Sequence, residues 1–381
     1  MKKGWYRAAI QRADNINLIF NAELVLEKDK PVLYIRNDKE RLRVDNIMIK
    51  GDSVFIDMPF FESSFKLVKS NDLSLKGVWI KGTSTKNLVL PVVFEYGKKE
   101  RFDKNAGSSA LVTGKWQVTF TRANGTERPA VAFFKQAGNY VSGSFITPSG
   151  DYRFLEGVLQ GSQLQLSCFD GSHAYLFTAD VDAGTISNGM FYSSASVPEK
   201  WRAVKNEKAV LPDTTQRTQL KEGESRLNFS FKDVKGNTVS ILDPRFQNKV
   251  VIIQLMGSWC PNCMDESRFL KEVYAAYKNK GVEFLAIAYE LTTDEARSRS
   301  SLQKFIDQFA IDYPVLIAHA AAGDEQKTEK TLPQLTPVRS FPTTIFIGKD
   351  GKVKHIHTGF DGPGTGIYYE QFKERFNSIV N

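Results

Sequence analysis

The chain has 381 residues, of which 41% are hydrophobic and 25% charged, and its formal net charge is +8. This length is too great for one ordinary compact core and predicts two or three domains, while the composition is that of a soluble globular protein. Lys and Arg alternate with Asp and Glu and never form a block of five or six like charges. That pattern favours a solvated surface and argues against nucleic acid as a partner, although an acidic membrane surface or protein would suit the charge.

The first half of the chain, up to about residue 205, consists of short runs in which apolar and polar residues alternate. Residues 31–37, 87–96 and 163–169 are examples, and Gly, Asn, Asp and Ser separate such runs. A period of two residues predicts β-strands, and strands at this spacing predict an all-β barrel or sandwich.

An internal repeat appears when the chain is compared with itself at an offset of about 110 residues. Residues 77–79 (GVW) then align with residues 189–191 (GMF), and other aromatic and Gly positions recur in the same order. We therefore expect two similar β units, residues 1–110 and 111–205, packed together or closed into a barrel. Chance similarity between two β-rich halves is the alternative.

Two reactive side chains lie in this β region. Cys168 belongs to an alternating strand, where a buried and inert thiol is the expected state. His173 follows a turn near Asp170 and is expected to be structural, because no second candidate ligand neighbours it. A redox role for Cys168 and a ligand or base role for His173 are the alternatives.

Residues 206–225 are polar, charged and interrupted by Pro212. The absence of apolar periodicity predicts an interdomain linker, followed by a C-terminal domain over residues 226–381.

The chemistry of the chain centres on the stretch from Val250 to Glu266, VVIIQLMGSWCPNCMDE. Its Val- and Ile-rich start predicts a buried strand, and apolar residues at three- and four-residue steps then predict a helix beginning at or just after Cys260. A helix start carries unpaired N–H groups and a partial positive charge, which favour a thiolate. We therefore expect Cys260 to be the nucleophile of thiol-disulfide exchange and Cys263 to resolve the mixed disulfide.

Two other roles for the CxxC pair compete with redox exchange. A closed zinc site needs four ligands, whereas the chain offers one further Cys and four His, with no second CxxC and no HxxxH. A structural disulfide is geometrically unfavourable at this spacing on a helix. Redox exchange is the favoured interpretation.

Residues 257–263, GSWCPNC, resemble the active site of the thioredoxin superfamily, and residues 340–344, SFPTT, resemble its cis-proline loop. With residues 229–243 as an N-terminal strand pair, the pattern is similar to the TlpA-like, membrane-associated thiol-disulfide oxidoreductases of bacterial envelopes. The resemblance implies an α/β thioredoxin-like domain, a central mixed sheet flanked by helices, over residues 226–381. Residues 114–179 resemble the β extension that precedes the redoxin domain in some envelope proteins of Bacteroidetes-type bacteria.

The resemblance also assigns roles to residues around the CxxC. Pro342 is expected in a cis peptide bond whose neighbouring backbone pairs with a bound substrate as with an added strand. Trp259, Pro261 and Phe341 are expected to contact the substrate beside it.

Glu266 is expected in the first turn of the helix, where a carboxylate is favourable without any function. The resemblance implies instead that it influences cysteine titration, and a partly buried carboxyl near Cys263 could accept that thiol's proton. Gln254 stands where thioredoxins carry a buried Asp, which leaves Glu266 as the replacement base. Glu290 is a strand-end carboxylate expected to do no more than cap the next turn.

The remaining pattern predicts a strand at 281–288, a helix from Ser301, a strand at 314–319, a hairpin across Asp350–Gly351 and a closing helix at 368–380. Residues 323–337 are expected to be a polar, mobile insertion.

The favoured function is that of a disulfide reductase acting on protein substrates, recharged by an upstream thiol reductant and requiring no cofactor or metal. The basic opening of the chain lacks an apolar segment behind it, so these residues do not make up a complete signal peptide. The resemblance favours the periplasm or cell envelope over the cytoplasm, with membrane attachment through a removed signal as a hypothesis. The ligand of the β region and the direction of electron flow stay open.

Three alternatives remain. A peroxiredoxin-type peroxidase needs Thr or Ser three residues before the Cys, where Gly257 stands. A thioredoxin-fold copper chaperone normally has CxxxC, one residue longer, although His355 and His357 could supply a ligand. The β half could also bind a partner while the C-terminal half only senses redox state.

Overall fold

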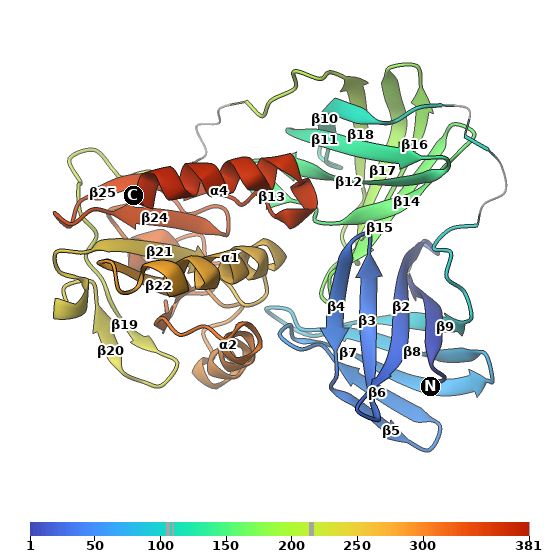
Figure 1. Ribbon diagram of the computed structural model, residues 1–381, viewed down its shortest axis with the longest axis horizontal. Coiled ribbons are helices and arrows are strands. Elements are labelled where there is room, and N and C mark those ends of the chain that lie inside the picture. The colour runs from blue at the N-terminus through green and yellow to red at the C-terminus, as the bar shows by residue number, and fades with distance from the viewer. Residues whose placement is uncertain (104–106, 109, 213–216, 381) are drawn as a thin grey trace. The chain divides into compact units, whose positions relative to one another are not determined.

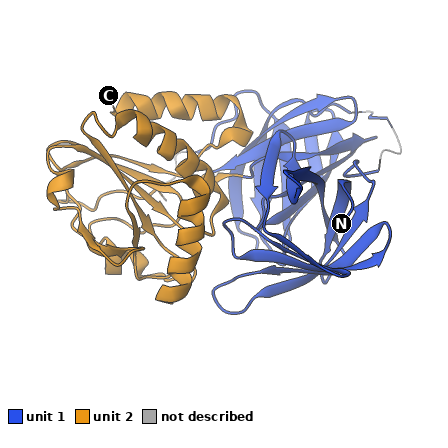
Figure 2. Ribbon diagram, turned by 60° about the horizontal axis from the view of Figure 1, so that its bottom comes forward, with its two compact units in different colours: residues 1–147, 152–212 blue, residues 148–151, 213–381 orange. Residues whose placement is uncertain are grey.

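The computed structural model describes residues 1–103, 107–108, 110–212 and 217–380. The chain divides into two compact units, residues 1–147 with 152–212 and residues 148–151 with 213–381 (Figure 2). The expected linker at 206–225 falls partly outside the described residues, because these exclude 213–216. Among the described residues, the helices all fall short of the length and apolar character needed to cross a membrane.

The first unit contains a nine-stranded sheet with the order β4-β3-β2-β1-β9-β8-β7-β6-β5 (Figure 1). Neighbouring strands in it are antiparallel and mostly consecutive in the chain, as in a meander. Its strands are β1 (Gly4–Gln11), β2 (Asn17–Glu27), β3 (Lys30–Asn37), β4 (Glu40–Val44), β5 (Ile47–Lys50), β6 (Ser53–Asp57), β7 (Ser63–Asn71), β8 (Ser74–Lys81) and β9 (Leu88–Tyr96).

A second nine-stranded sheet in the same unit has the order β11-β10-β18-β17-β16-β15-β14-β12-β13. A further ladder between β11 and β12 closes it into a barrel. Its strands are β10 (Gly114–Thr121), β11 (Glu127–Ala137), β12 (Tyr140–Thr147), β13 (Gly150–Asp151), β14 (Leu155–Gln160), β15 (Gln163–Phe169), β16 (Ala174–Asp182), β17 (Thr185–Ser193) and β18 (Glu199–Lys205).

Alternate residues of these strands form the apolar cores, as the two-residue period predicted. Trp79 and Phe191, which the sequence repeat aligns, are both buried core residues, one in each sheet. The expectation of an all-β region made of two similar units is therefore confirmed.

Buried polar groups connect the two sheets within the first unit. Arg101, which follows β9, donates to the backbone oxygen of Ser167 in β15 at 2.8 Å and to the side-chain oxygen of Asn21 in β2 at 3.2 Å. It also pairs with Glu156 at 2.6 Å. Asn37 donates to the backbone oxygen of Phe169 at 2.8 Å. Because buried charges are costly unless they are paired, these contacts specify one arrangement of the sheets.

The two reactive residues of the first unit lie where the sequence analysis expected. Cys168 is buried in the core of the second sheet, and burial raises the pKa of its thiol. The Nδ1 atom of His173 lies 3.1 Å from the carboxylate of Asp170, and burial lowers the pKa of the imidazole. Because the Cys168 thiol is buried and its pKa is raised, it is protonated and inaccessible at neutral pH.

The second unit is built on a seven-stranded mixed sheet with the order β20-β19-β23-β22-β21-β24-β25. Strands β21, β22 and β23 are parallel, while β24 and β25 run antiparallel to their neighbours. The strands are β19 (Ser230–Asp233), β20 (Thr238–Ser240), β21 (Val250–Met256), β22 (Val282–Ala288), β23 (Val315–Ile317), β24 (Thr343–Ile347) and β25 (Val353–Thr358). This mixed sheet confirms the expected α/β thioredoxin-like fold.

Helices and loops cover the two faces of this sheet. The helices are α1 (Pro261–Tyr277), α2 (Glu295–Phe309), α3 (Lys327–Thr331) and α4 (Ile367–Val380), with short 3₁₀ turns at Pro244–Phe246 and Pro363–Thr365. Phe269 of α1 packs edge-on against Phe372 and Phe376 of α4, so these two helices share one face. The strand–helix–strand unit β21-α1-β22 is the one predicted from the CxxC stretch.

The expectation of a polar, mobile insertion at 323–337 is wrong. This segment contains α3, and Leu332 and Leu335 are fully buried in the core on the other face of the sheet, together with Val338. These three residues recur at a three-residue spacing within a polar background, a signal too short to register as a helical pattern.

Candidate active site

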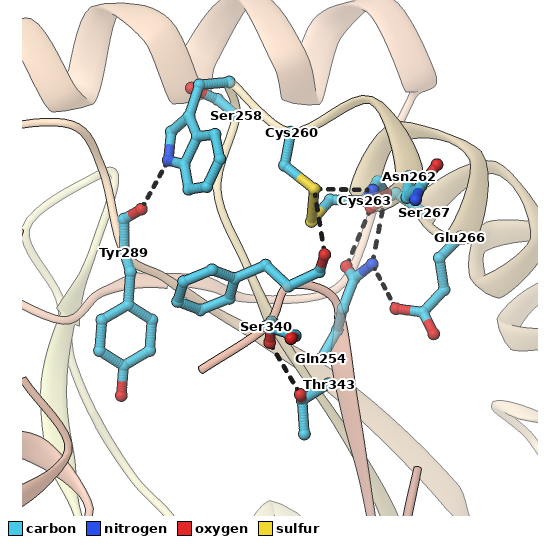
Figure 3. Close-up of a disulfide and its surroundings, with 12 residues drawn as sticks. Gln254, Ser258, Cys260, Asn262, Cys263, Glu266, Ser267, Tyr289, Ser340 and Thr343 are labelled. Carbon is cyan, nitrogen blue, oxygen red and sulfur yellow. Dashed lines mark hydrogen bonds between the residues drawn. A yellow bond between two sulfur atoms is a disulfide. The ribbon is translucent and has the colours of Figure 1, made fainter. Parts of the chain in front are cut away.

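The two cysteines of the CxxC motif lie at the start of α1, directly after the carboxyl end of β21 (Figure 3). They form a disulfide whose Cα atoms are 5.2 Å apart. Cys260 is the N-cap residue of the helix, and its Sγ accepts the backbone N–H of Cys263 at 3.2 Å. Pro261 occupies the first helical position, where a missing N–H costs nothing and the fixed φ angle suits the helix.

The two cysteines are both buried but differ slightly in exposure. Cys260 is 5% exposed and Cys263 is not exposed at all. The Sγ of Cys260 also lies 3.6 Å from the backbone oxygen of Phe341, the residue before Pro342. The Phe341–Pro342 peptide bond is cis, as expected. The loop before β24 thus reaches the sulfur that an incoming disulfide would meet.

Aromatic side chains flank the disulfide. The indole Nε1 of Trp259 donates to the backbone oxygen of Tyr289 at 2.9 Å, which fixes the ring. The ring of Phe341 lies edge-on to Trp259, at 5.9 Å between centroids, and 5.3 Å from Tyr289. Trp259 and Phe341 are partly exposed, so these two rings place an apolar surface next to Cys260.

A buried carboxylate holds the turn that precedes the cysteines. Glu290 accepts the backbone N–H of Ser258 at 2.8 Å and its hydroxyl at 2.6 Å. Hydrogen bonds to a buried carboxylate are strong, and two of them hold the backbone and the side chain of Ser258. They therefore fix the turn that leads into Trp259 and Cys260. The sequence analysis assigned Glu290 only to capping the next turn and missed this contact, which spans 32 residues.

Glu266 is completely buried between α1 and the sheet. Its Oε2 accepts from the side-chain amide of Gln254 at 2.8 Å, and its Oε1 accepts from the hydroxyl of Thr344 at 2.6 Å. The Gln254 amide also donates to the backbone oxygen of Cys263 at 3.3 Å, so one side chain links the carboxyl to the helix turn that carries the disulfide (Figure 3). Burial raises the pKa of Glu266 to about 7, although the two hydrogen bonds oppose the shift.

The expected position of Glu266 in the first helical turn is wrong. The helix begins at Pro261, so Glu266 is its sixth residue and lies in the second turn. There the partial charge of the helix start is weak, and the environment of the carboxyl is set by burial instead. Its elevated pKa reflects this difference.

The structure brings most of the proposed site residues together. Cys260, Cys263, Trp259 and Phe341 are in contact or hydrogen-bonded around the disulfide, and Glu266 joins them through Gln254. His355 and His357 lie elsewhere, on β25. His357 packs against Phe372 of α4 at 5.2 Å between ring centroids.

The fold and this geometry define a class of protein: a thioredoxin-fold domain with a disulfide-bonded CxxC pair at a helix start. A redoxin family model matches residues 221–371. The thiol-disulfide oxidoreductase ResA of Geobacillus kaustophilus is 30% identical over 145 residues, which cover 38% of this chain and 74% of that protein. ResA of Halalkalibacterium halodurans is 26% identical over 166 residues, covering 43% of this chain and 80% of that protein.

Among solved structures, a thiol:disulfide interchange protein DsbE from Chlorobium tepidum aligns with a TM-score of 0.33 and 21% identity, covering 43% of this chain and all of that one. The chain belongs to the redoxin family of thiol-disulfide oxidoreductases, with the family domain at its C-terminal end and the two β sheets ahead of it.

A Gly257→Ala substitution is expected to displace Trp259 and to lower the rate of thiol-disulfide exchange about 10- to 100-fold. A Cβ atom at Gly257 would lie 2.2 Å from Trp259 Nε1, so the indole must leave its bond to Tyr289. Tryptophan fluorescence and exchange kinetics would measure both effects. Gly323→Ala is the matched control, because a Cβ there meets nothing within 4 Å. Wild-type kinetics in Gly257→Ala would show that the position of the indole is unimportant.

Proposed function

We propose that this chain is a disulfide reductase that acts on protein substrates through the Cys260/Cys263 couple. The observation that carries the proposal is the position of Cys260 at the N-cap of α1, where its sulfur accepts the N–H of Cys263. An N–H donor and the helix start both lower the free energy of a thiolate, which is the attacking species in disulfide exchange.

The proposed reaction transfers two electrons from the reduced protein to the substrate. The Cys260 thiolate attacks one sulfur of a substrate disulfide, and the other substrate sulfur leaves as a thiolate. Cys263 then gives its proton to the Glu266 carboxylate and attacks Cys260 Sγ. The second substrate thiolate leaves, both substrate thiolates take protons from water, and the Cys260–Cys263 disulfide remains.

The pKa of about 7 suits Glu266 to this role. A general base works best when its pKa is near the operating pH, because it is then able both to take and to release a proton. The Gln254 bridge to the backbone of Cys263 supports the assignment of Glu266 to the second cysteine.

We assign substrate contact to Trp259, Pro261, Phe341 and Pro342. The aromatic pair Trp259 and Phe341 offers an apolar surface beside Cys260, and the Phe341 carbonyl faces the Cys260 sulfur. An extended substrate segment would lie against this loop while its cysteine is bonded to Cys260.

The partners and the compartment follow from the same proposal. The oxidised couple needs an upstream thiol reductant, whereas the exchange itself needs no cofactor or metal. We place the protein in the periplasm or cell envelope, where protein disulfides persist and need reduction. The proposed reaction uses residues of the second unit, so the β sheets of the first unit are free to bind a partner or ligand.

The reduction potential of the Cys260/Cys263 pair tests the proposed direction of electron flow. We expect a value near or below about −250 mV, on the thioredoxin side of the scale. Equilibration in thiol redox buffers followed by alkylation and mass spectrometry would measure it, with Cys168→Ala as background so that only the pair is counted. A potential near about −120 mV would show an oxidant that installs disulfides, and would contradict the proposal.

A further inference from the structure

Glu266 is completely buried, yet its carboxyl changes protonation state in the proposed reaction. Its proton either returns to Cys263 when the couple is reduced again or exchanges with solvent, and the second course needs a path. Water cannot reach the carboxyl directly, so the proton must pass through one of its two hydrogen-bond partners, Gln254 or Thr344.

The Gln254 side leads into the closed interior. The amide oxygen of Gln254 accepts the hydroxyl of Ser267 at 2.9 Å, and its nitrogen donates to the backbone of Cys263 (Figure 3). Ser267 and Cys263 are both fully buried. An amide is also a poor carrier of protons, because passing a proton on would leave it as the unfavourable imidic acid tautomer, whereas a hydroxyl that accepts one proton and donates another is unchanged.

The Thr344 side leads toward solvent, although Thr344 itself is fully buried, because its cross-strand neighbour His357 is partly exposed. Thr344 lines a cavity of about 330 Å³ between β24, β25 and the last turns of α4. The cavity is large enough for several water molecules. Its rim carries the exposed side chains of Arg217, Arg375 and Ser378, so the cavity communicates with bulk water.

The register of the sheet places an imidazole beside Thr344. Gln254 pairs with Thr344 across β21 and β24, and Thr344 pairs with His357 across β24 and β25. Directly paired residues present their side chains on the same face at about 5 Å between Cβ atoms. Gln254, Thr344 and His357 thus form a polar row that starts beside Glu266 and ends in the cavity.

The charges around the imidazole keep it neutral. Burial lowers the pKa of His357 to about 4, and Arg375, His355 and Arg217 add to the shift. Asp361 lies 3.5 Å from Arg375 and offsets part of that charge. A neutral imidazole has one nitrogen that accepts a proton and one that donates, and it passes an arriving proton to water because the charged form is unfavourable in this environment.

We propose that the Thr344 hydroxyl and His357 form the route by which Glu266 exchanges its proton with water in the cavity. The Thr344 hydroxyl, which donates to Glu266 in the structure, first turns away from the carboxyl. Protonated Glu266 then gives its proton to the Thr344 oxygen while the Thr344 hydroxyl proton moves to His357. His357 then releases a proton to bulk water and returns to its neutral form. Thr344 and His357 are positioning residues in this scheme, since neither touches the cysteines.

The proposal rests on the proposed function for its purpose, yet the route can be tested without substrate or reductant. We would follow the infrared carbonyl stretch of protonated Glu266 in the oxidised full-length protein after a rapid pH jump, with Glu266→Gln to identify the band. We expect Thr344→Val and His357→Phe to slow this proton exchange at least tenfold. Thr344→Ser, which keeps the hydroxyl, and Ser378→Ala, at the cavity rim, should exchange at the wild-type rate.

Each variant has an outcome that would overturn part of the scheme. Wild-type exchange in Thr344→Val would remove Thr344 from the route, and slow exchange in Thr344→Ser would show that the effect is one of packing. Wild-type exchange in His357→Phe would remove His357. Failure of the disulfide reductase assay alongside these expected infrared rates would count against the proposed function and leave the proton route standing.

Discussion

A Cys260→Ser variant is expected to lose thiol-disulfide exchange by a factor of about 10³ or more, because a serine hydroxyl neither ionises at neutral pH nor forms a disulfide. A Cys263→Ser variant should behave differently. It keeps Cys260, the proposed nucleophile, so it should react once with a substrate disulfide and then stop as a mixed disulfide at Cys260. Turnover of insulin by dithiothreitol-reduced protein would measure the first effect, and mass spectrometry of the trapped complex would identify the second.

The contrast between these two variants tests the assignment of roles. Cys168→Ala is the matched control, because Cys168 is buried in the first unit and should not change the rate. If Cys260→Ser instead trapped the substrate through Cys263, the order of the two cysteines would be reversed. The difference in exposure, 5% for Cys260 against none for Cys263, argues for Cys260 as the attacking sulfur.

As the pH rises from about 4.5 to about 7, the wild type is expected to lose about 3 kcal/mol of stability relative to a Glu266→Gln variant. The pKa of Glu266 is raised from 4.5 to about 7 in the folded protein, so between these values the folded state binds a proton that the unfolded state has released. The stabilisation from this proton is fully present below about pH 4.5 and is lost as the pH rises through about 7. Glutamine cannot ionise and lacks this dependence.

The pH dependence of Glu266 can be measured on the second unit alone within the intact chain. Hydrogen exchange of the slowest amides in β21 and β22 reports the free energy of unfolding of that sheet, without requiring both units to unfold together. Glu272→Gln is the matched control, because Glu272 lies on the exposed face of the same helix. Parallel stability curves for wild type and Glu266→Gln across this range would show that the carboxyl titrates normally.

The two predictions address the same chemistry from different sides. The cysteine variants test which sulfur attacks, and the glutamate variant tests whether the pKa of Glu266 is raised to about 7 in the folded protein. Burying a carboxyl that is half protonated near pH 7 lowers the stability of the folded protein at that pH. Such destabilising groups are common at functional sites.

The sequence by itself determined the class of this protein and the location of its chemistry. A Val- and Ile-rich strand, a Gly-Ser turn and a CxxC at the start of an amphipathic helix are local features, and local physics places Cys260 at a helix N-terminus. The two-residue period of the first half likewise predicts β sheets, because side-chain alternation follows from strand geometry alone. The hairpin across Asp350–Gly351 and the closing helix are confirmed as well, because turn residues and the helical period are also local signals.

Only the tertiary structure decided the surroundings of Glu266. Its hydrogen bond to Thr344 joins residues 78 positions apart, and its burial depends on α1 and β24 meeting across the sheet. Sequence spacing predicted Glu266 in the first helical turn, but the helix begins at Pro261 and Glu266 lies in the second turn. The sequence also gave no sign that the Glu290 carboxylate accepts a hydrogen bond from Ser258. The pKa of a buried group is set by desolvation and by partners that the fold brings together, and neither is encoded in the neighbouring residues.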